Sequence, residues 1–289
     1  VVDRPDRPCI SHEVGNYNTF PRLSKGIQDL TPPGKASKFT KPFWLNAAHD
    51  HLQSIGLLQE NDLWSTRSEQ LYAFNYKQLV EGIRLSPWMS GYEWWCFAEF
   101  WMSGDGIVDY ALDPKPGVSA ATLRSFVGEM VLLATGPAGI VVYPDDMVAT
   151  QPLPPAFTSG ARLSAKLLLS NFGPVNLTGD FVRWEVRVNG TAICSGAGRA
   201  STTLEQGEIT AIGGIVDCAL PDLGSFPAAL PAQTRAPVRV ELASMLVASD
   251  GKTGERCLLL DIQTLCAEMP DLGALSVVQC SPTTLGARG

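Results

Sequence analysis

The stretch Pro8-Cys-Ile-Ser-His-Glu-Val-Gly-Asn-Tyr17 decides how the first part of the chain is interpreted. From Pro8 to Val14 it contains a short apolar run, typical of a buried parallel strand, that ends at polar residues including His12 and Glu13. Gly15 permits a tight turn directly behind Glu13. We therefore expect a strand whose tip presents the Glu13 carboxylate.

Two segments with helical periodicity follow this strand. Apolar residues recur near the helical period from Lys41 to Leu58 and again from Ser68 to Leu85. The aromatic run from Gly91 to Trp101 then predicts a second buried strand, and Ser119 is the expected N-cap of an amphipathic helix that reaches Leu133. A strand, helices and a second strand are the alternation of a parallel α/β sheet.

From Gly136 onward the hydrophobic period changes to two, which predicts strands separated by turns. Val188-Asn-Gly190 and Ser249-Asp-Gly251 are typical hairpin turns. The change of period places a domain boundary between residues 1–135 and residues 136–289. The seven candidate strands are Gly139 to Val142, Ala161 to Asn171, Phe181 to Val188, Ala192 to Ala197, Glu208 to Leu220, Val238 to Ala248 and Cys257 to Gln263. This set favours an antiparallel β-sandwich of the immunoglobulin type.

Composition excludes several classes of function. The chain has 289 residues, 45% of them hydrophobic, which suits a globular protein of roughly two domains. Its net charge is -7 and it has no basic run that could neutralise a row of phosphates, so we expect no nucleic-acid partner. No apolar stretch approaches the roughly 20 residues of a membrane-spanning helix, so we expect no membrane span.

The cysteines and the N-glycosylation sequons indicate in which cellular compartment the protein is expected. The seven cysteines have neither CxxC spacing nor histidine partners, which argues against a zinc site and leaves buried thiols or a few disulfides. Asn176 and Asn189 begin Asn-x-Thr sequons that would accept N-glycans in a secretory compartment. We therefore expect an extracellular or secretory location. The sequence starts at Val1 without a leader, which predicts a processed or truncated product.

An ordered series of motifs adds to this interpretation. Ile10-Ser-His-Glu-Val-Gly-Asn-Tyr17 resembles the seventh-strand motif of glycoside hydrolase family 2, which contains β-galactosidases, β-glucuronidases and β-mannosidases. Gly91-Tyr-Glu-Trp-Trp95 resembles the eighth strand of that family, and Ser103-Gly-Asp-Gly-Ile-Val-Asp109 with Lys115-Pro-Gly117 resembles its closing segment. The resemblance covers residues 7–135. It implies the C-terminal portion of a (β/α)8 TIM barrel, followed by an immunoglobulin-like β-sandwich.

The resemblance also implies roles for individual residues. Glu13 matches the catalytic nucleophile of a retaining β-glycosidase, and Trp94 matches the aromatic residue that lines the sugar subsite. His12, Asn16 and Tyr17 flank the nucleophile and could bind sugar hydroxyls. Residue type alone leaves alternatives open, because a carboxylate at a strand end is equally often a surface residue and a histidine there is more often structural.

Two further carboxylates, Glu93 and Glu99, lie on the aromatic strand, where an unpaired charge is costly to bury. Both are better explained as structural partners of an arginine or a backbone donor than as catalysts. We expect one of them to reach the mouth of the barrel.

The sequence departs from the family in one important respect. Retaining enzymes use two carboxylates, and the family acid/base follows an asparagine, but no Asn-Glu pair occurs in this chain. The acid/base and six barrel strands would have to come from the N-terminal remainder of the same precursor or from a companion chain. We expect a carbohydrate substrate and neither cofactor nor metal. The alternatives are a non-catalytic, glycosidase-derived scaffold or carbohydrate-binding protein, and an adhesion module, which would account for residues 136–289 only.

Overall fold

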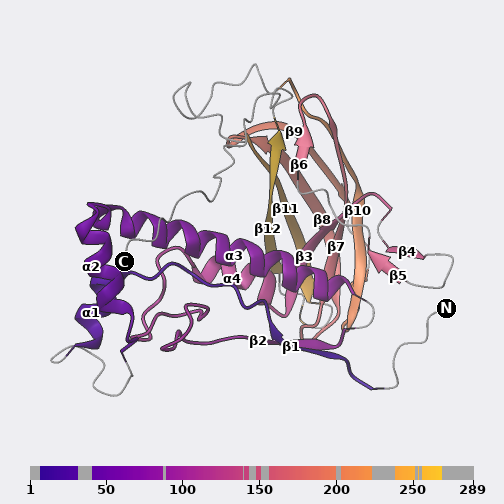
Figure 1. Cartoon of the computed structure of the whole chain (residues 1–289). Helices are drawn as coiled ribbons and strands as arrows, with labels where there is room; N and C mark the ends of the chain where they lie inside the picture. The colour runs from indigo at the N-terminus through magenta and orange to yellow at the C-terminus, as the bar shows by residue number, and fades with distance from the viewer. Residues whose placement is uncertain are drawn as a thin grey trace.

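The computed structural model describes residues 7–31, 41–86, 89–138, 140–142, 148–150, 156–199, 203–222, 238–250, 253 and 256–268. The first part is mostly helical (Figure 1). Its elements are β1 (Ile10–Val14), α1 (Leu23–Leu30), α2 (Leu45–Ser54), the short 3-10 helix η1 (Leu58–Glu60), α3 (Asn61–Leu85), β2 (Gly91–Trp94) and α4 (Ala120–Val127).

The second part consists of strands. They are β3 (Met130–Thr135), β4 (Ile140–Val142), β5 (Val148–Thr150), β6 (Ala156–Thr158), β7 (Arg162–Asn171), β8 (Leu177–Val188), β9 (Thr191–Arg199), β10 (Glu208–Ala219), β11 (Val238–Asp250) and β12 (Arg256–Glu268). A three-stranded sheet has the order β10-β7-β3, and a five-stranded sheet has the order β6-β12-β11-β8-β9. Strands β4 and β5 form a separate pair.

The two larger sheets pack face to face into a sandwich with one apolar core (Figure 1). Leu169 and Val216 from the three-stranded sheet and Val186 and Leu242 from the five-stranded sheet are all fully buried in it. Alternation along each strand sends every second side chain into this core, which is why the period of two is visible in the sequence. A disulfide between Cys194 of β9 and Cys218 of β10 joins the two sheets covalently.

Local turn chemistry explains one of the hairpins. Asn189 and Gly190 connect β8 to β9, and both have positive φ, 47° and 82°. A two-residue turn of this type requires left-handed backbone at both central positions, which Asn and Gly tolerate best. The Asn189 Oδ1 atom also accepts a hydrogen bond from the backbone N–H of Arg239 at 3.2 Å.

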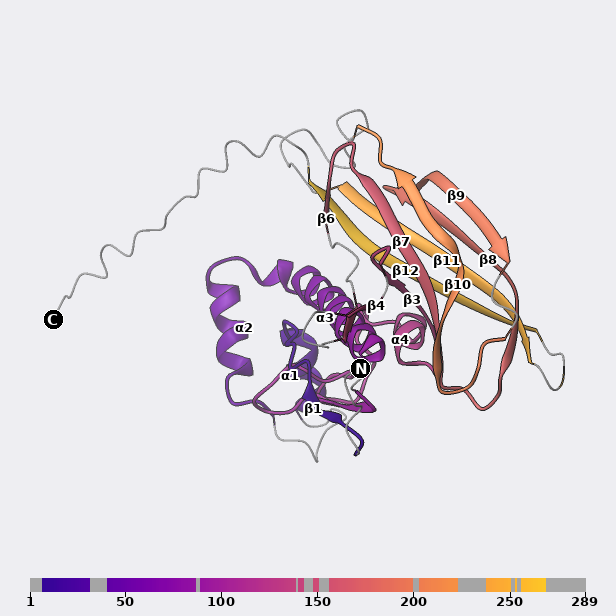
Figure 2. The ribbon, with the colours of Figure 1, turned by 90° about the vertical axis from the view of Figure 1, so that its right-hand side faces the viewer.

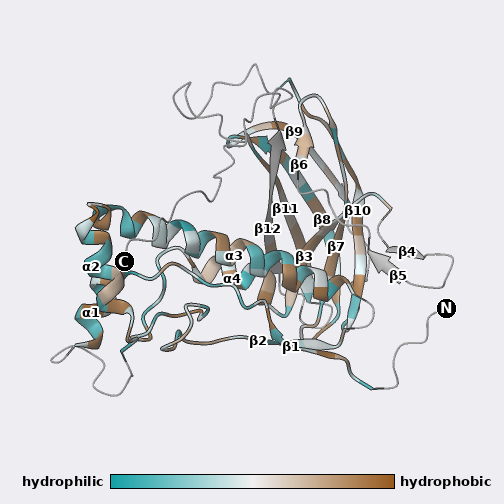
Figure 3. Ribbon diagram, viewed as in Figure 1, coloured by the Kyte–Doolittle hydropathy of each residue, from teal (hydrophilic) through white to brown (hydrophobic). Residues whose placement is uncertain are grey.

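The helical part covers one face of the parallel pair β1–β2. The long helix α3 buries one side, which includes Tyr72, Tyr76 and Val80, and leaves the other side in contact with solvent. Apolar and polar residues accordingly alternate along this helix in Figure 3. Its buried side forms a core cluster with Val14 of β1 and Phe126 of α4. This cluster fixes the position of the two strands.

The helical part is attached to the sandwich through α4, which lies between α3 and β3 (Figure 2). The side chain of Ser119 accepts a hydrogen bond from the backbone N–H of Thr122 at 3.0 Å, so the expected N-cap is present. Arg84, near the end of α3, donates to the carbonyls of Phe126 and Gly128 and to the Ser170 hydroxyl of β7. Burial lowers the pKa of Arg84.

The predicted fold class is wrong. The α/β half was expected to be a portion of a TIM barrel, but the described residues contain only one two-stranded parallel sheet there, and nothing in them continues it toward the eight strands of a barrel. The protein is instead mostly β-sheet with four α-helices in its described part. The sandwich was expected to be antiparallel, and this also needs correction, because β6 pairs in parallel with β12.

The structure also places the start of the sandwich before residue 136. Strand β3 pairs with β7 along its whole length, from Met130 to Thr135. Leu132 of this strand is buried in the sandwich core. The three-stranded sheet therefore includes residues that the sequence division assigned to the first part.

Candidate functional site

The candidate site lies at the carboxyl ends of the parallel strands β1 and β2. Ile10 is paired with Gly91 and Val14 with Trp94, with a register irregularity between them. Ligands of parallel sheets bind outside the carboxyl ends of the strands, because there the loops diverge and leave backbone and side chains accessible. Glu13 occupies this end of β1, as the sequence predicted.

The backbone around Glu13 has an unusual conformation. Glu13 has φ 50°, Gly15 has φ 100° and Asn16 has φ 27°, so three of four consecutive residues from Glu13 to Asn16 lie in the left-handed region. Such conformations are costly for residues with a Cβ atom and are concentrated at functional sites. Both Glu13 and Asn16 are exposed to solvent. The strained segment therefore presents its carboxylate outward.

A histidine and a second carboxylate lie beside Glu13. The Nε2 atom of His12 is 3.3 Å from Oε2 of Glu93, which lies on the neighbouring strand β2. Their side chains remain 73% and 59% exposed, so this pair is open to a ligand and contributes little to stability. Neighbouring strands are about 4.8 Å apart. His12 and Glu93 therefore meet across the two strands, one residue before Glu13 in the chain.

The two aromatic residues of the predicted site, Tyr17 and Trp94, are partly buried and pack against the core cluster that contains Tyr76. Trp94 stacks on Tyr76 with ring centroids 4.0 Å apart and donates its Nε1–H to the Tyr72 hydroxyl at 3.2 Å. Tyr17 contacts the edge of Tyr76 at 5.2 Å. Through these contacts the Trp94 ring packs against Tyr76 and Tyr72. Its role as a sugar platform stays a prediction.

Trp95, which directly follows β2, is a candidate that the sequence interpretation missed. It is partly exposed, and it contacts Phe100 edge to face with centroids 6.0 Å apart. The Tyr76 hydroxyl donates to its backbone carbonyl. Strand pairing could have identified this residue. Trp94 pairs with the buried Val14 and packs in the same cluster, and the side chain of the next residue on a strand points to the opposite face.

Glu99 has a structural role. It is buried, with Oε1 2.6 Å from the Lys115 Nζ atom, and it accepts a hydrogen bond from the Thr19 hydroxyl at 3.0 Å. Burial raises its pKa, and the nearby Lys115 opposes this rise. Glu99 was expected to be a structural partner of an arginine or a backbone donor, and its partners are instead the side chains of Lys115 and Thr19. Of the two carboxylates on the aromatic run, only Glu93 is exposed.

Cys96 is next to the site but is unsuited to nucleophilic chemistry. Its thiol donates to the Ala98 carbonyl at 3.0 Å and to Asp105 Oδ1 at 3.3 Å. Burial, together with the hydrogen bond to Asp105, raises the pKa of this thiol to about 12. The reactive thiolate form is therefore scarce at neutral pH.

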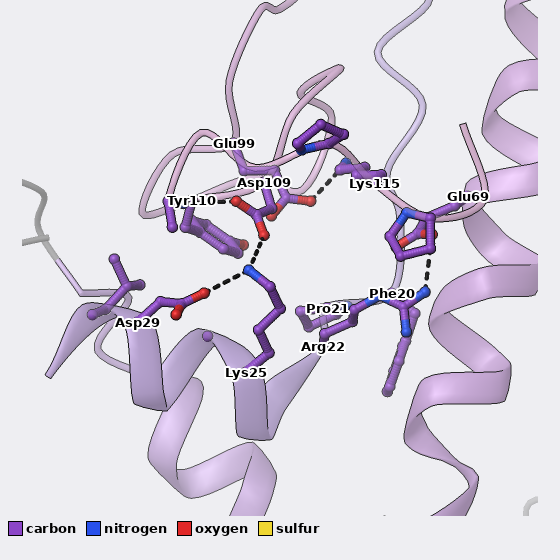
Figure 4. Close-up of a pocket in the computed structure, with 15 residues that line it drawn as sticks. Phe20, Pro21, Arg22, Lys25, Asp29, Glu69, Glu99, Asp109, Tyr110 and Lys115 are labelled. Carbon is purple, nitrogen blue, oxygen red and sulfur yellow. Dashed lines mark hydrogen bonds and ion pairs between the residues drawn. The ribbon is translucent and has the colours of Figure 1, made fainter. Parts of the chain in front are cut away.

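A separate pocket lies between α1 and the loop that follows β2 (Figure 4). Lys25 is at its centre, with Nζ 2.5 Å from an oxygen of Asp29, 2.7 Å from one of Asp109 and 2.8 Å from one of Asp113. Burial alone would lower the pKa of Lys25, but the hydrogen bonds to these three carboxylates outweigh it and raise the pKa above its usual value. Lys25 is therefore fully charged at neutral pH.

The predicted glycosylation positions are both accessible. Asn176 is exposed and accepts a hydrogen bond from the Gln206 N–H through Oδ1 at 2.8 Å. Asn189 is exposed at the β8–β9 turn, and its Oδ1 is likewise an acceptor. A glycan is attached through the side-chain nitrogen, so both of these contacts leave the atom that would be modified free to react.

Comparisons with known proteins do not assign a family. No protein-family model and no curated protein matches the chain. Among solved structures, the sporulation control protein Spo0M from Bacillus subtilis is 12% identical over 49% of this chain and 50% of its own, with a TM-score of 0.29. A family 123 glycoside hydrolase from Clostridium perfringens is 10% identical over 49% of this chain and 27% of its own, with a TM-score of 0.23. Likenesses this weak carry neither a fold family nor a function.

No helix in the described ranges is long and apolar enough to cross a membrane.

Proposed function

We propose that the chain is the C-terminal piece of a retaining β-glycosidase that hydrolyses O-glycosidic bonds of oligosaccharides or polysaccharides, with Glu13 as the nucleophile. The observation that carries this proposal is the exposed Glu13 carboxylate, held in left-handed backbone at the carboxyl end of a parallel strand. The resemblance of the segments around Glu13 and Trp94 to glycoside hydrolase family 2 supports the same role.

The proposed mechanism uses the position of this carboxylate. Glu13 attacks the anomeric carbon, the glycosidic oxygen leaves with a proton from a general acid, and a covalent glycosyl ester forms. Water then hydrolyses the ester, with the acid now acting as a base. His12, Asn16 and Tyr17 lie close enough in sequence to contact sugar hydroxyls at this strand end.

The general acid is proposed to come from outside this chain. Of the described carboxylates on β1 and β2, only Glu93 accompanies Glu13, and its contact is with His12. We therefore assign the acid to an upstream segment of the same precursor or to a companion chain. Such a partner would also cover the exposed apolar side chains of Ile10 and Phe97, which are 62% and 68% exposed.

A secretory or extracellular location accompanies this proposal. The Cys194–Cys218 disulfide joins the two sheets, and disulfides form and persist in oxidising compartments. The two exposed sequons support the same location. We infer no nucleic-acid partner from the charge of -7.

The second candidate function is a non-catalytic, carbohydrate-binding scaffold. It is favoured by the sequence, which contains no Asn-Glu pair that could supply the acid/base of the family. The two functions differ in whether a covalent intermediate forms.

The test is turnover of aryl β-glycosides by the complete protein with Glu13→Gln. The substitution keeps shape and removes the anionic nucleophile, so we expect kcat to fall by several orders of magnitude with little change in stability. Glu208→Gln, an exposed carboxylate of the sandwich, is the matched control and should leave kcat unchanged. Unchanged turnover in Glu13→Gln would contradict the assignment, and absence of turnover from the unsubstituted protein on a broad panel would favour the scaffold.

A further inference from the structure

A tight turn in the loop after β2 exposes two large apolar side chains. The backbone N–H groups of Phe100 and Ser103 each donate to the carbonyl of the other, at 3.2 and 3.1 Å. Trp101 and Met102 form the tip of this turn, and they are 46% and 62% exposed. Turns favour Gly, Pro, Asn, Asp and Ser, so a tip made of Trp and Met is unusual. Adjacent apolar side chains held in water are typical of an interaction surface.

The turn is fixed to the segment that follows Glu13. The Oδ1 atom of Asn18 accepts hydrogen bonds from the Ser103 hydroxyl at 2.7 Å and from the Gly104 N–H at 3.0 Å. The backbone N–H of Thr19 donates to the Gly104 carbonyl at 3.0 Å. Because Asn18 follows Glu13 by only five residues, their α-carbons lie within about 18 Å of each other. The turn therefore has a fixed position near the candidate site.

Side-chain contacts support the turn from two further directions. Phe100 packs edge to face on Trp95, which directly follows β2, with ring centroids 6.0 Å apart. On the other side, the Nε1–H of Trp44 donates to the backbone carbonyl of Trp101 at 3.2 Å. These contacts hold the backbone of the turn and leave the Trp101 indole ring partly in solvent. An aromatic series, Trp95, Phe100 and Trp101, thus leads from the end of β2 to the turn.

The polar groups that hold the tip are neutral. Asn18 is exposed and uses Oδ1 within the protein, which leaves its Nδ2 group as a donor for a ligand. The Ser103 hydroxyl donates to Asn18, and its oxygen can still accept. A sugar ring has complementary chemistry, because its axial C–H groups form an apolar face and its hydroxyls both donate and accept. This combination of one aromatic ring with neutral donors and acceptors therefore suits a carbohydrate.

We propose that Trp101, with the Asn18 carboxamide and the Ser103 hydroxyl, forms a remote subsite that binds a sugar ring of an oligosaccharide or polysaccharide away from the bond that is cleaved. The inference rests on the proposed function, since it takes the carbohydrate chain bound at Glu13 to continue to the turn. It assigns the protein to long carbohydrate chains rather than to single glycosides.

A remote subsite has a kinetic signature. Only a substrate long enough to reach the turn gains binding energy there. Loss of the Trp101 ring should therefore lower kcat/KM for a long substrate and leave a short one unaffected. A purely structural role of Trp101 would change both substrates alike.

The first test compares kcat/KM of the complete protein on a β-linked hexasaccharide and on an aryl β-monoglycoside of the same sugar. Trp101→Ala should lower kcat/KM at least about tenfold on the hexasaccharide and leave it within about twofold on the monoglycoside. Trp101→Phe keeps a ring and should recover most of the loss. Phe172→Ala is the matched control, because Phe172 is an aromatic residue of the sandwich that is 54% exposed, and it should change neither value.

Asn18→Asp tests the polar part of the subsite. The substitution keeps the Oδ1 acceptor for Ser103 and Gly104 and replaces the Nδ2 donor with an oxygen. The turn should therefore stay in place, with Tm unchanged, while kcat/KM falls on the hexasaccharide and not on the monoglycoside. Unchanged kcat/KM on the hexasaccharide would remove Asn18 from the subsite and contradict the proposal.

Binding measurements separate this inference from the proposed function, because they require no turnover. Tryptophan fluorescence and calorimetry of the complete protein with cellohexaose, mannohexaose, xylohexaose and chitohexaose should detect binding that Trp101→Ala weakens at least about tenfold. That result in a protein that cleaves nothing would support the subsite and contradict the role of Glu13.

Three outcomes overturn the subsite whatever the role of Glu13. The first is that the unsubstituted protein binds none of these hexasaccharides. The second is that Trp101→Ala binds and cleaves them unchanged, or loses kcat/KM equally on both substrates. The third is that Trp101→Ala releases the upstream piece or the companion chain in gel filtration while hexasaccharide binding is unchanged, which would make the turn a protein interface.

Discussion

The α-carbon of Gly15 packs against the ring of Tyr76 so closely that a Cβ atom at position 15 would lie 2.5 Å from Cε1 of the tyrosine. The same ring stacks on Trp94, and its hydroxyl donates to the backbone carbonyl of Trp95. Tyr76 thus touches the segment after β1 and the segment after β2 at once. The position of Glu13 relative to β2 depends on this contact.

Gly15→Ala should destabilise the protein and displace Glu13. Left-handed backbone costs a residue with a Cβ atom about 1–2 kcal/mol, and overpacking against Tyr76 costs about 1–3 kcal/mol more. Gly56→Ala is the matched control, because Gly56 has φ 72° but no atom lies within 4 Å of the position that its added Cβ atom would take. Urea unfolding should show the larger loss for Gly15→Ala, and equal losses would contradict the role of the contact.

Glu93→Gln should lower turnover without a measurable loss of stability. The His12–Glu93 pair is largely exposed, and pairs of this kind contribute about 0–1 kcal/mol to folding. Glu93 lies opposite the His12–Glu13 segment in the strand pair, where its charge would influence the proposed site. Asp217→Asn breaks the exposed Arg162–Asp217 pair of the sandwich and should affect neither quantity. Turnover of Glu93→Gln equal to that of Asp217→Asn would place Glu93 outside the site.

Asn176 and Asn189 should carry N-glycans in protein from its native source. Both are exposed, and both follow the Asn-x-Thr pattern that the glycosylation machinery accepts. Mass spectrometry of the two peptides, before and after enzymatic deglycosylation, measures this directly. Unmodified masses for both peptides would remove the main support for a secretory location.

Local sequence signals predicted the positions of many elements. The alternating segments that begin at Ala161 and Glu208 correspond to β7 and β10, and the apolar run ending at Val14 corresponds to β1. The Ser119 side chain caps α4 as expected. These signals succeed because side-chain period and capping are short-range properties of the chain.

Properties that depend on distant contacts were not predictable in the same way. A strand–helix–strand pattern is common to every parallel sheet, so residues 8–101 could not reveal how many strands the sheet contains. The sequence also does not indicate which of the consecutive tryptophans Trp94 and Trp95 points into the core. The packing of Trp94 depends on its contact with Tyr76, which is distant in sequence. Lys25 and Asp113 are 88 residues apart, so their contact left no motif in the sequence.

The role of Glu13 is tested most directly by covalent labelling of the complete protein with a 2-deoxy-2-fluoro glycoside, followed by peptide mass spectrometry. A retaining mechanism passes through a glycosyl ester, which the fluorine makes long-lived. We expect the label on Glu13, in the peptide that also contains His12, and we expect Glu13→Gln to prevent labelling. A label on any other carboxylate, or turnover with no label on Glu13, would contradict this role.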